Sequence, residues 1–174
     1  MATSTTNLSH YDTASVPDAS AMRIGIVVSE WNRSITTKLL DGARETLLKC
    51  GVKPENITVE YAPGSFELPT AAQFLLDTLR IDGVICLGSV VRGETPHFDF
   101  ICQSTANGIM NCGLRNSRPV IFGVLTGTMD FDAWTATEQA EARSGGQHGN
   151  KGVDSAIACI KMVALRKKMR ESSR

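Results

Sequence analysis

The stretch GVICLGSVVRGETPHFDF, residues 83–100, decides the fold that we expect for this chain. It opens with a short apolar run over residues 83–87 that is typical of a buried β-strand. A glycine-containing polar loop follows, and a helix is predicted to begin near Asp99. Open α/β sheets place their ligands where an apolar strand ends in such a loop before a helix. The loop contains both Arg92 and His97. The stretch therefore predicts an anion-binding site with a residue that transfers a proton.

The same order of strand, loop and helix recurs along the chain. Strands are predicted at residues 22–28, 57–61, 83–87 and 119–125. A helical apolar period follows each of the first three, with Ser34 as the expected cap of the first helix and Gly51 as its stop. A short helix over residues 135–143 and a last helix over residues 150–169 complete the chain. This alternation predicts an α/β fold, a three-layer αβα sandwich around a four-stranded parallel sheet.

Length and charge limit the classes of function. At 174 residues we expect one domain, residues 21–174, preceded by a flexible tail or arm over residues 1–20. The 18 basic and 18 acidic residues balance, which argues against binding of nucleic acid or an anionic membrane. No apolar run is long enough to span a bilayer, and the first residues do not form a secretory signal.

The five cysteines, at positions 50, 86, 102, 112 and 159, form no C-x-x-C pair. An odd number of cysteines at core-like positions indicates reduced thiols and a cytoplasmic protein. No spacing typical of a dinucleotide, P-loop, serine-hydrolase or metal site occurs. This argues against NAD, P-loop, serine-hydrolase and zinc chemistry.

Polar or aromatic residues follow every predicted strand, and parallel strands bring these ends to one edge of the sheet. His97 is the best candidate for general acid–base catalysis, the alternative being an ordinary exposed loop histidine. Asp99 either orients it or caps the next helix. Trp31 suits stacking on a flat heterocycle or half-buried packing. Glu67 suits binding of sugar hydroxyls or a favourable interaction with a helix dipole.

Gly93, Glu94 and Thr95 are able to present backbone N–H groups to an anion. Arg143, at the end of the short helix, is a second anion candidate, although a single arginine is more often simply solvated.

Taken together, these segments resemble the lumazine synthase family of riboflavin biosynthesis. The matching stretches are GIVVSEWN, APGSFELP, LGSVVRGETPHFDF, PVIFGVLT and GNKGVD, in the family's order over about residues 22–165. The resemblance implies a flavodoxin-like fold whose N-terminal arm adds a strand to a neighbouring subunit. It also implies a transferase that needs no cofactor or metal.

The implied reaction condenses 5-amino-6-ribitylaminouracil with 3,4-dihydroxy-2-butanone 4-phosphate. The products are 6,7-dimethyl-8-ribityllumazine, phosphate and water. Imine formation, phosphate elimination and ring closure each move protons, so one histidine and good positioning suffice.

The resemblance also assigns roles by position. Trp31 matches the aromatic residue that stacks on the pyrimidine, and His97 matches the proton-transfer histidine. The other matched residues bind substrate: Ser65, Phe66 and Glu67 at the ribityl chain, Val90 and Val91 at the heterocycle, Glu94 and Thr95 at the phosphate, and Phe122, Arg143 and Lys151 on the far side of the site. Arg92 is then expected to be structural.

Assembly is a further implication of the resemblance. In the family, the residues matched by Phe122 and Arg143 come from the adjacent subunit, so the site is completed only in a homopentamer. Whether pentamers join into an icosahedral shell is left open, as is retention of riboflavin by Trp31. The segment TGTMDFDAW, residues 126–134, looks longer than in the family and makes the alignment of Arg143 less direct.

Two other classes of function remain at this stage. One is a flavin- or lumazine-binding module without catalysis, and the other is a structural shell protein. The presence of His97, Arg143 and Lys151 together favours the enzyme, because neither a binder nor a shell needs a proton carrier.

Overall fold

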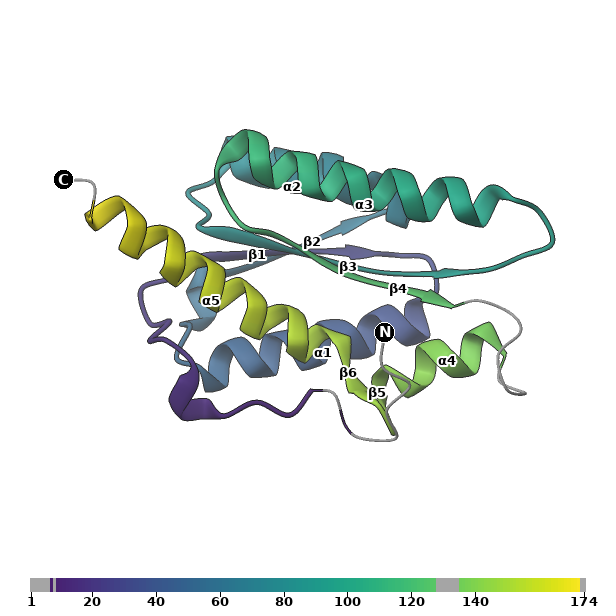
Figure 1. Ribbon diagram of the computed structural model, residues 1–174, viewed down its shortest axis with the longest axis horizontal. Coiled ribbons are helices and arrows are strands. Elements are labelled where there is room, and N and C mark those ends of the chain that lie inside the picture. Colours follow the sequence, from purple (N-terminus) through teal and green to yellow (C-terminus); the bar gives the residue numbers. More distant parts are fainter. Residues whose placement is uncertain (1–6, 8, 128–134, 173–174) are drawn as a thin grey trace.

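The computed structural model describes residue 7, residues 9–127 and residues 135–172, and its centre is one parallel sheet (Figure 1). The strands are β1 (Ile24–Ser29), β2 (Ile57–Ala62), β3 (Gly83–Val91) and β4 (Val120–Gly127). Their order across the sheet is β2-β1-β3-β4, so β2 and β4 are its edges. With helices on both faces, this is the doubly wound order of the flavodoxin-like fold. The expected α/β sandwich is confirmed.

Helices α2 and α3 cover one face of the sheet, and α1, α4 and α5 lie on the other (Figure 1). The α-helices of the described residues are α1 (Arg33–Lys49), α2 (Leu68–Thr78), α3 (His97–Asn116), α4 (Ala136–Ala142) and α5 (Lys151–Glu171). Short 3-10 turns occur at η1 (Thr13–Ser15), η2 (Pro54–Asn56) and η3 (Ser65–Glu67). A small antiparallel hairpin, β5 (Ser144–Gly146) and β6 (Gly149–Asn150), joins α4 to α5.

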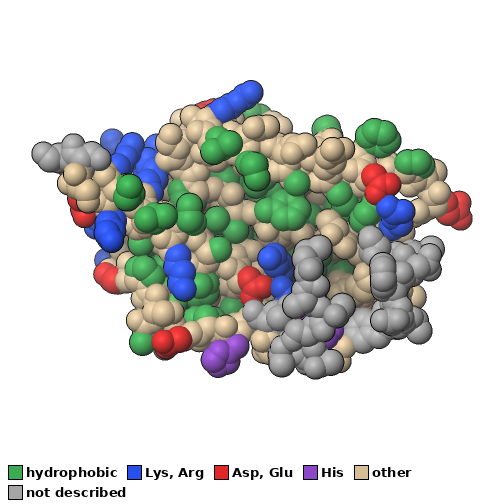
Figure 2. Space-filling model, in the orientation of Figure 1, with side chains coloured by type: hydrophobic (Ala, Val, Ile, Leu, Met, Phe, Trp, Pro, Cys, Tyr) green, Lys and Arg blue, Asp and Glu red, His purple; other side chains and the backbone are tan. Residues whose placement is uncertain are grey.

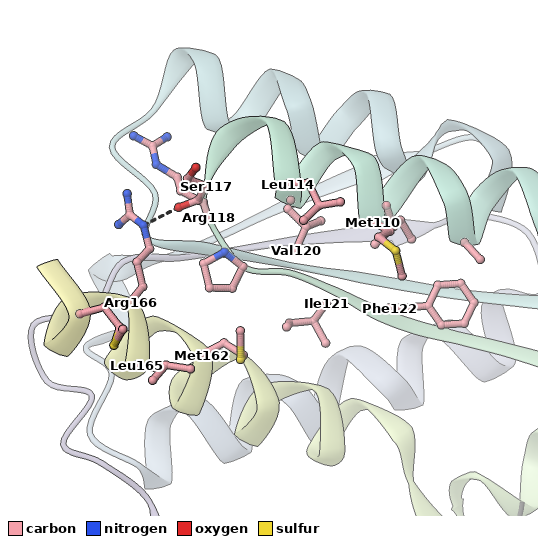
Figure 3. A pocket seen from close by; sticks show the side chains of 15 residues that line it. Met110, Leu114, Ser117, Arg118, Val120, Ile121, Phe122, Met162, Leu165 and Arg166 are labelled. Carbon is pink, nitrogen blue, oxygen red and sulfur yellow. Dashed lines mark hydrogen bonds between the residues drawn. The ribbon is translucent and has the colours of Figure 1, made fainter.

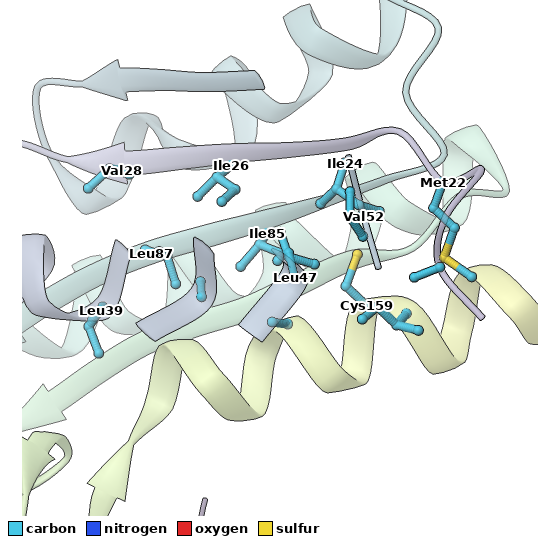
Figure 4. Close-up of a cluster of buried hydrophobic side chains, with 14 of the residues drawn as sticks. Met22, Ile24, Ile26, Val28, Leu39, Leu47, Val52, Ile85, Leu87 and Cys159 are labelled. Carbon is cyan, nitrogen blue, oxygen red and sulfur yellow. The ribbon is translucent and has the colours of Figure 1, made fainter. Parts of the chain in front are cut away.

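Strand alternation divides the core between the two faces of the sheet. Ile24, Ile26 and Val28 of β1 point toward α1 and α5, where they pack with Ile85 and Leu87 of β3 (Figure 4). The intervening residue Val27 points to the opposite face and packs under α2 and α3. These strand residues are at most 1% exposed on either face, as the nearly continuous apolar strands predict.

The first helix begins differently from the prediction. Its N-cap is Asn32, in the left-handed conformation with φ 57°, and Ser34 is an exposed residue of the first turn. The Asn32 side chain donates from Nδ2 to the Ser89 carbonyl at 2.8 Å, a hydrogen bond that Ser34 does not make. At the other end, Gly51 has φ 93° directly after the C-cap, so the predicted stop is confirmed.

Strand β3 is longer than its apolar run. The predicted strand ended at residue 87, whereas pairing with β4 continues until Val91 meets Gly127. Helix α3 correspondingly begins at His97 instead of near Asp99. The β5–β6 hairpin was predicted only as a break in the helical pattern, because Ser144–Gly146 and Gly149–Asn150 are too short to show alternation.

The described part of the N-terminal segment runs along its own domain. Ala19 is fully buried, Val16 packs against the core, and Ser9 Oγ accepts from the Asn150 N–H at 2.7 Å. Residues 128–134 of the expected long loop lie outside the described residues. Among the described helices, none is long and apolar enough to cross a membrane.

Candidate active site

The carboxyl ends of β1 and β2 bring an aromatic ring and a carboxylate together. The Glu30 N–H donates to the Ala62 carbonyl at 2.9 Å, so the two chains stay paired just beyond the strands. A Cβ on Gly64 would lie 3.0 Å from Glu67 Oε2 and 3.5 Å from Trp31 Cδ1. Because Gly64 has no side chain, Trp31 and Glu67 can both approach its backbone. Trp31 is 72% exposed and offers its ring to a ligand.

Ser65 lies beneath this pair, at the start of η3. Its backbone carbonyl accepts from Thr105 Oγ1 of α3 at 3.1 Å, which holds the turn against the helix. A Cβ on Gly88 of β3 would lie 2.6 Å from Ser65 Oγ, so only glycine allows this approach. The buried Ser65 hydroxyl has no hydrogen-bond partner in the described residues, whereas its neighbour Phe66 is exposed.

The end of β3 leads into an open loop. Val90 and Val91 are half-buried strand residues, so their backbone is fixed by pairing with β4. The Arg92 N–H then donates to the Gly127 carbonyl at 3.0 Å. Beyond it Glu94 and Thr95 are exposed, and nothing lies within 4 Å of a Cβ built on Gly93. The loop is thus exposed and open on the side where Gly93 lacks a side chain.

His97 is exposed at the first position of α3, at the end of this loop. Asp99 does not orient it, because Asp99 Oδ1 instead pairs with Arg92 Nη2 at 2.5 Å. The Arg92 guanidinium also lies 5.0 Å from the centre of the Phe98 ring. Arg92 therefore links the start of the loop to the first turn of α3, and His97 remains exposed to solvent.

Arg143 and Lys151 form a separate group on the other face of the sheet. Arg143 is the C-cap of α4, and Lys151 begins α5. The β5–β6 hairpin brings them together, with the Lys151 N–H donating to the Arg143 carbonyl at 2.8 Å. Arg143 Nη2 contacts Asp154 Oδ2 at 2.7 Å, and Nη1 donates to the His148 carbonyl. The guanidinium is thus held in place by one carboxylate and one carbonyl.

Phe122 belongs to neither group. It lies in the middle of β4, opposite Cys86 of β3, and lines a groove along the outer edge of the sheet (Figure 3). No hydrogen bond or ion pair of the described residues joins Arg143, Lys151 or Phe122 to His97 or Trp31. Phe122 lies within β4, and Arg143 and Lys151 lie where α4 ends and α5 begins. The other predicted site residues follow or end the strands β1, β2 and β3: Trp31, Ser65, Phe66, Glu67, Val90, Val91, Glu94, Thr95 and His97.

Two residues near the candidate site were not predicted. Asp154 is three residues after Lys151, so both lie in the first turn of one helix. This spacing was the only feature of the sequence that could have placed Asp154 near the site. Asn32 stands directly after Trp31, and asparagine adopts the left-handed conformation more readily than most residues, but nothing in the sequence indicates its hydrogen bond to Ser89. Among the described residues, no three histidine, cysteine or acidic side chains gather as they would around a metal ion.

Comparison with known proteins identifies the family of the chain. A sequence model of the 6,7-dimethyl-8-ribityllumazine synthase family matches residues 21–167. A protein of Parabacteroides distasonis with that name is 55% identical over 94% of this chain and 98% of its own length. Proteins of the same name from Porphyromonas gingivalis and Phocaeicola vulgatus are 49% and 47% identical, over 95% and 99% of this chain and 98% of their own lengths. The chain therefore belongs to the 6,7-dimethyl-8-ribityllumazine synthase family.

Proposed function

We propose that this protein condenses 5-amino-6-ribitylaminouracil with 3,4-dihydroxy-2-butanone 4-phosphate to give 6,7-dimethyl-8-ribityllumazine, phosphate and water. Membership of the family supports this reaction. The observation that carries it is that Trp31 and Glu67 lie together at Gly64, while the open loop before His97 follows the carboxyl end of the adjacent strand β3. An exposed ring, an acceptor for hydroxyls, an anion loop and a proton carrier are what the two substrates require.

Each group of the site has a role in this proposal. The Trp31 ring stacks on the pyrimidine, and Glu67 accepts hydrogen bonds from the ribityl hydroxyls near Ser65 and Phe66. The backbone of Val90 and Val91 borders the heterocycle. Loop residues Glu94 and Thr95 donate backbone N–H groups to the phosphate, in space that Gly93 leaves open.

His97 moves the protons of the reaction. Imine formation, phosphate loss and ring closure all need proton transfer at an accessible imidazole, and His97 is exposed beside the anion loop. Because positioning of two substrates supplies much of the acceleration, the chain itself carries enough groups for the chemistry.

The site is completed by a second copy of the chain. In this proposal Phe122, Arg143 and Lys151 act at the far side of the site, with Phe122 and Arg143 reaching the substrate of a neighbouring subunit. Their separation from the Trp31 group supports this arrangement. The apolar groove at the β4 edge, about 730 Å³, gives the neighbour a place to pack (Figure 2). We propose a homopentamer, alone or in an icosahedral shell.

The cellular setting follows from the same proposal. All five cysteines are free thiols, and burial raises the pKa of the Cys86 and Cys159 thiols. Reduced thiols of this kind support a cytoplasmic enzyme.

The direct test mixes purified protein with both substrates and follows the fluorescent lumazine product, with the spontaneous reaction subtracted. We expect product formation well above the spontaneous rate, in proportion to protein concentration. A rate equal to the spontaneous one would contradict the enzyme and leave a binding module or a shell protein.

Binding of riboflavin is a second candidate property, favoured by the exposed Trp31 ring. Stacking of the isoalloxazine ring on Trp31 should quench flavin fluorescence on titration with protein. Substitution of Trp31 by leucine should abolish the quenching, and quenching that survives it would place the flavin elsewhere.

A further inference from the structure

A second cationic hollow lies at the amino-terminal edge of the sheet, opposite the candidate active site. Its volume is about 480 Å³, and four chain segments form it. These are the residue before β1, the end of α2 with the turn into β3, the residue two before β4, and the end of α5. Five arginines line it, Arg23, Arg80, Arg118, Arg166 and Arg170, together with the carboxylates of Asp77 and Asp82.

Among the described residues, the two carboxylates form no ion pair with these arginines. Asp77 Oδ1 accepts from Gln73 Nε2 at 2.8 Å, and Asp82 Oδ2 accepts from the backbone N–H of Arg23 at 2.9 Å. In the described residues, no carboxylate oxygen lies within 4.0 Å of any of the five guanidinium groups. The hollow therefore holds an excess of three positive charges in a protein whose formal net charge is zero.

Two of the guanidinium groups are held by hydrogen bonds, of which Figure 3 shows the one from Arg166 to Ser117. Arg118 Nη1 donates to the Leu76 carbonyl at 2.9 Å, and Arg166 Nε donates to the Ser117 carbonyl at 2.6 Å. Both side chains are half-buried, and each bond uses one of five N–H donors. Burial lowers the pKa of Arg166, as do the nearby Arg170 and Arg118, whereas Asp82 raises it, so these cations are close enough to repel one another.

Capping of helix ends explains only part of this cluster. Leu76 and Ser117 lie at the ends of α2 and α3, where carbonyls lack helical partners, so Arg118 and Arg166 act as caps. The same explanation does not extend to Arg23, Arg80 and Arg170, whose side chains make no hydrogen bond to the described residues. Three exposed arginines thus line the hollow without a side-chain hydrogen bond to the described part of the chain.

We propose that this hollow binds a diphosphate or triphosphate group of a small molecule. The planar guanidinium fork matches two phosphate oxygens at once, and several forks from different segments suit a chain of phosphates. An excess of three charges balances the charge of such a group. The concave shape favours a small ligand over a protein surface. The site is separate from the active site, because the eight residues of β4 span about 26 Å.

The test is calorimetric titration of the full-length protein with inorganic pyrophosphate at constant ionic strength. The variant Arg80→Gln with Arg170→Gln removes two charges without breaking any hydrogen bond of the structure. The matched control, Lys38→Gln with Arg44→Gln, removes two exposed charges from α1. We expect one pyrophosphate per chain, affinity at least about tenfold lower in the first variant, and unchanged affinity in the control.

Four results would overturn the proposal. The first is absence of binding to the wild-type protein. The second is an equal loss of pyrophosphate affinity in the control variant, which would show that binding depends only on the overall charge of the protein. The third is abolition of binding by Arg143→Gln, which would place pyrophosphate in the active site. The fourth is a smaller assembly of the Arg80→Gln and Arg170→Gln variant in light scattering, which would show that these arginines pair with carboxylates of another copy.

Discussion

At the scale of single residues, His97 is the one side chain on which the proposed chemistry depends. We predict that His97→Ala lowers kcat by about a hundredfold, the low end of what general acid–base catalysis contributes, with KM little changed. Steady-state kinetics with the spontaneous rate subtracted would measure this. His10→Ala, at an exposed position of the N-terminal segment, is the control and should behave as wild type. Full activity of the His97 variant would remove its proton-transfer role.

Arg143 tests the second half of the site. Its guanidinium is half-buried and held by Asp154 at 2.7 Å. We predict that Arg143→Ala raises KM for the phosphorylated substrate about tenfold or more, because a charge-assisted hydrogen bond to phosphate is lost. KM for the pyrimidine should change much less. An unchanged KM for the phosphorylated substrate would show that the alignment through residues 126–134 is shifted.

Asp154 provides a companion measurement to Arg143. Asp154→Asn keeps the shape of the side chain but weakens its hold on the guanidinium, so KM for the phosphorylated substrate should rise by less than in Arg143→Ala. The pairing of Arg143 with Asp154 could not be predicted from the sequence. Eleven residues and a hairpin separate the two partners, and no local period relates them.

At the scale of elements, the sequence predicts what rests on local patterns. Apolar runs and helical periods located all four main strands and all five α-helices of the described residues, and Gly51 marked the first helix end. The end of β3 was missed because Gly88 and Ser89 interrupt the apolar run while the backbone continues to pair. The cap of α1 was missed because Asn32 is positioned by a carbonyl of another strand, Ser89.

The Asn32 cap therefore provides a test of how β1 and β3 are joined. Asn32→Gly keeps the left-handed backbone but removes the hydrogen bond to Ser89, and should cost about 1 kcal/mol in the free energy of unfolding. Asn32→Ala should cost about 1 kcal/mol more, because alanine is strained at φ 57°. Denaturant unfolding of the two variants separates the contributions. Equal stabilities would show that the backbone relaxes there.

Helix α4 carries a pH-dependent cap at its N-terminus, the end opposite Arg143. The backbone N–H and hydroxyl of Thr135 donate to Glu138 and hold the pKa of its carboxyl below the ordinary 4.5. Since the folded state lowers this pKa, the cap stabilises above pH 4.5 and is lost as pH falls through the folded value. Glu138→Gln should thus be less stable than wild type at neutral pH, with the difference shrinking below pH 4.5. Glu141→Gln on the same helix is the control, and a pH-independent difference would contradict this origin.

At the scale of the whole molecule, the fold of one chain gives no reason for several apolar side chains to be exposed. A band of them follows the groove between α3 and α5 along the β4 edge (Figure 2). Met110 and Leu114 are 65% and 70% exposed there, and Met162 and Leu165 face them from α5 (Figure 3). A patch of this kind on a small protein usually marks an interface between proteins. Phe122 lines the same groove, which links assembly to the proposed site.

This link makes assembly and activity inseparable in the proposed pentamer. We predict that Met162→Glu with Leu165→Glu gives smaller species in light scattering, because burying two carboxylates without partners costs several kcal/mol. Activity should fall with assembly, since Phe122 and Arg143 of a neighbour no longer reach the Trp31 group. Leu48→Glu, a partly exposed apolar position on α1, is the control and should keep both properties. A fully active monomer from the double variant would mean that one chain builds the whole site, and the separation of Arg143 from His97 would then have to close by movement within the chain.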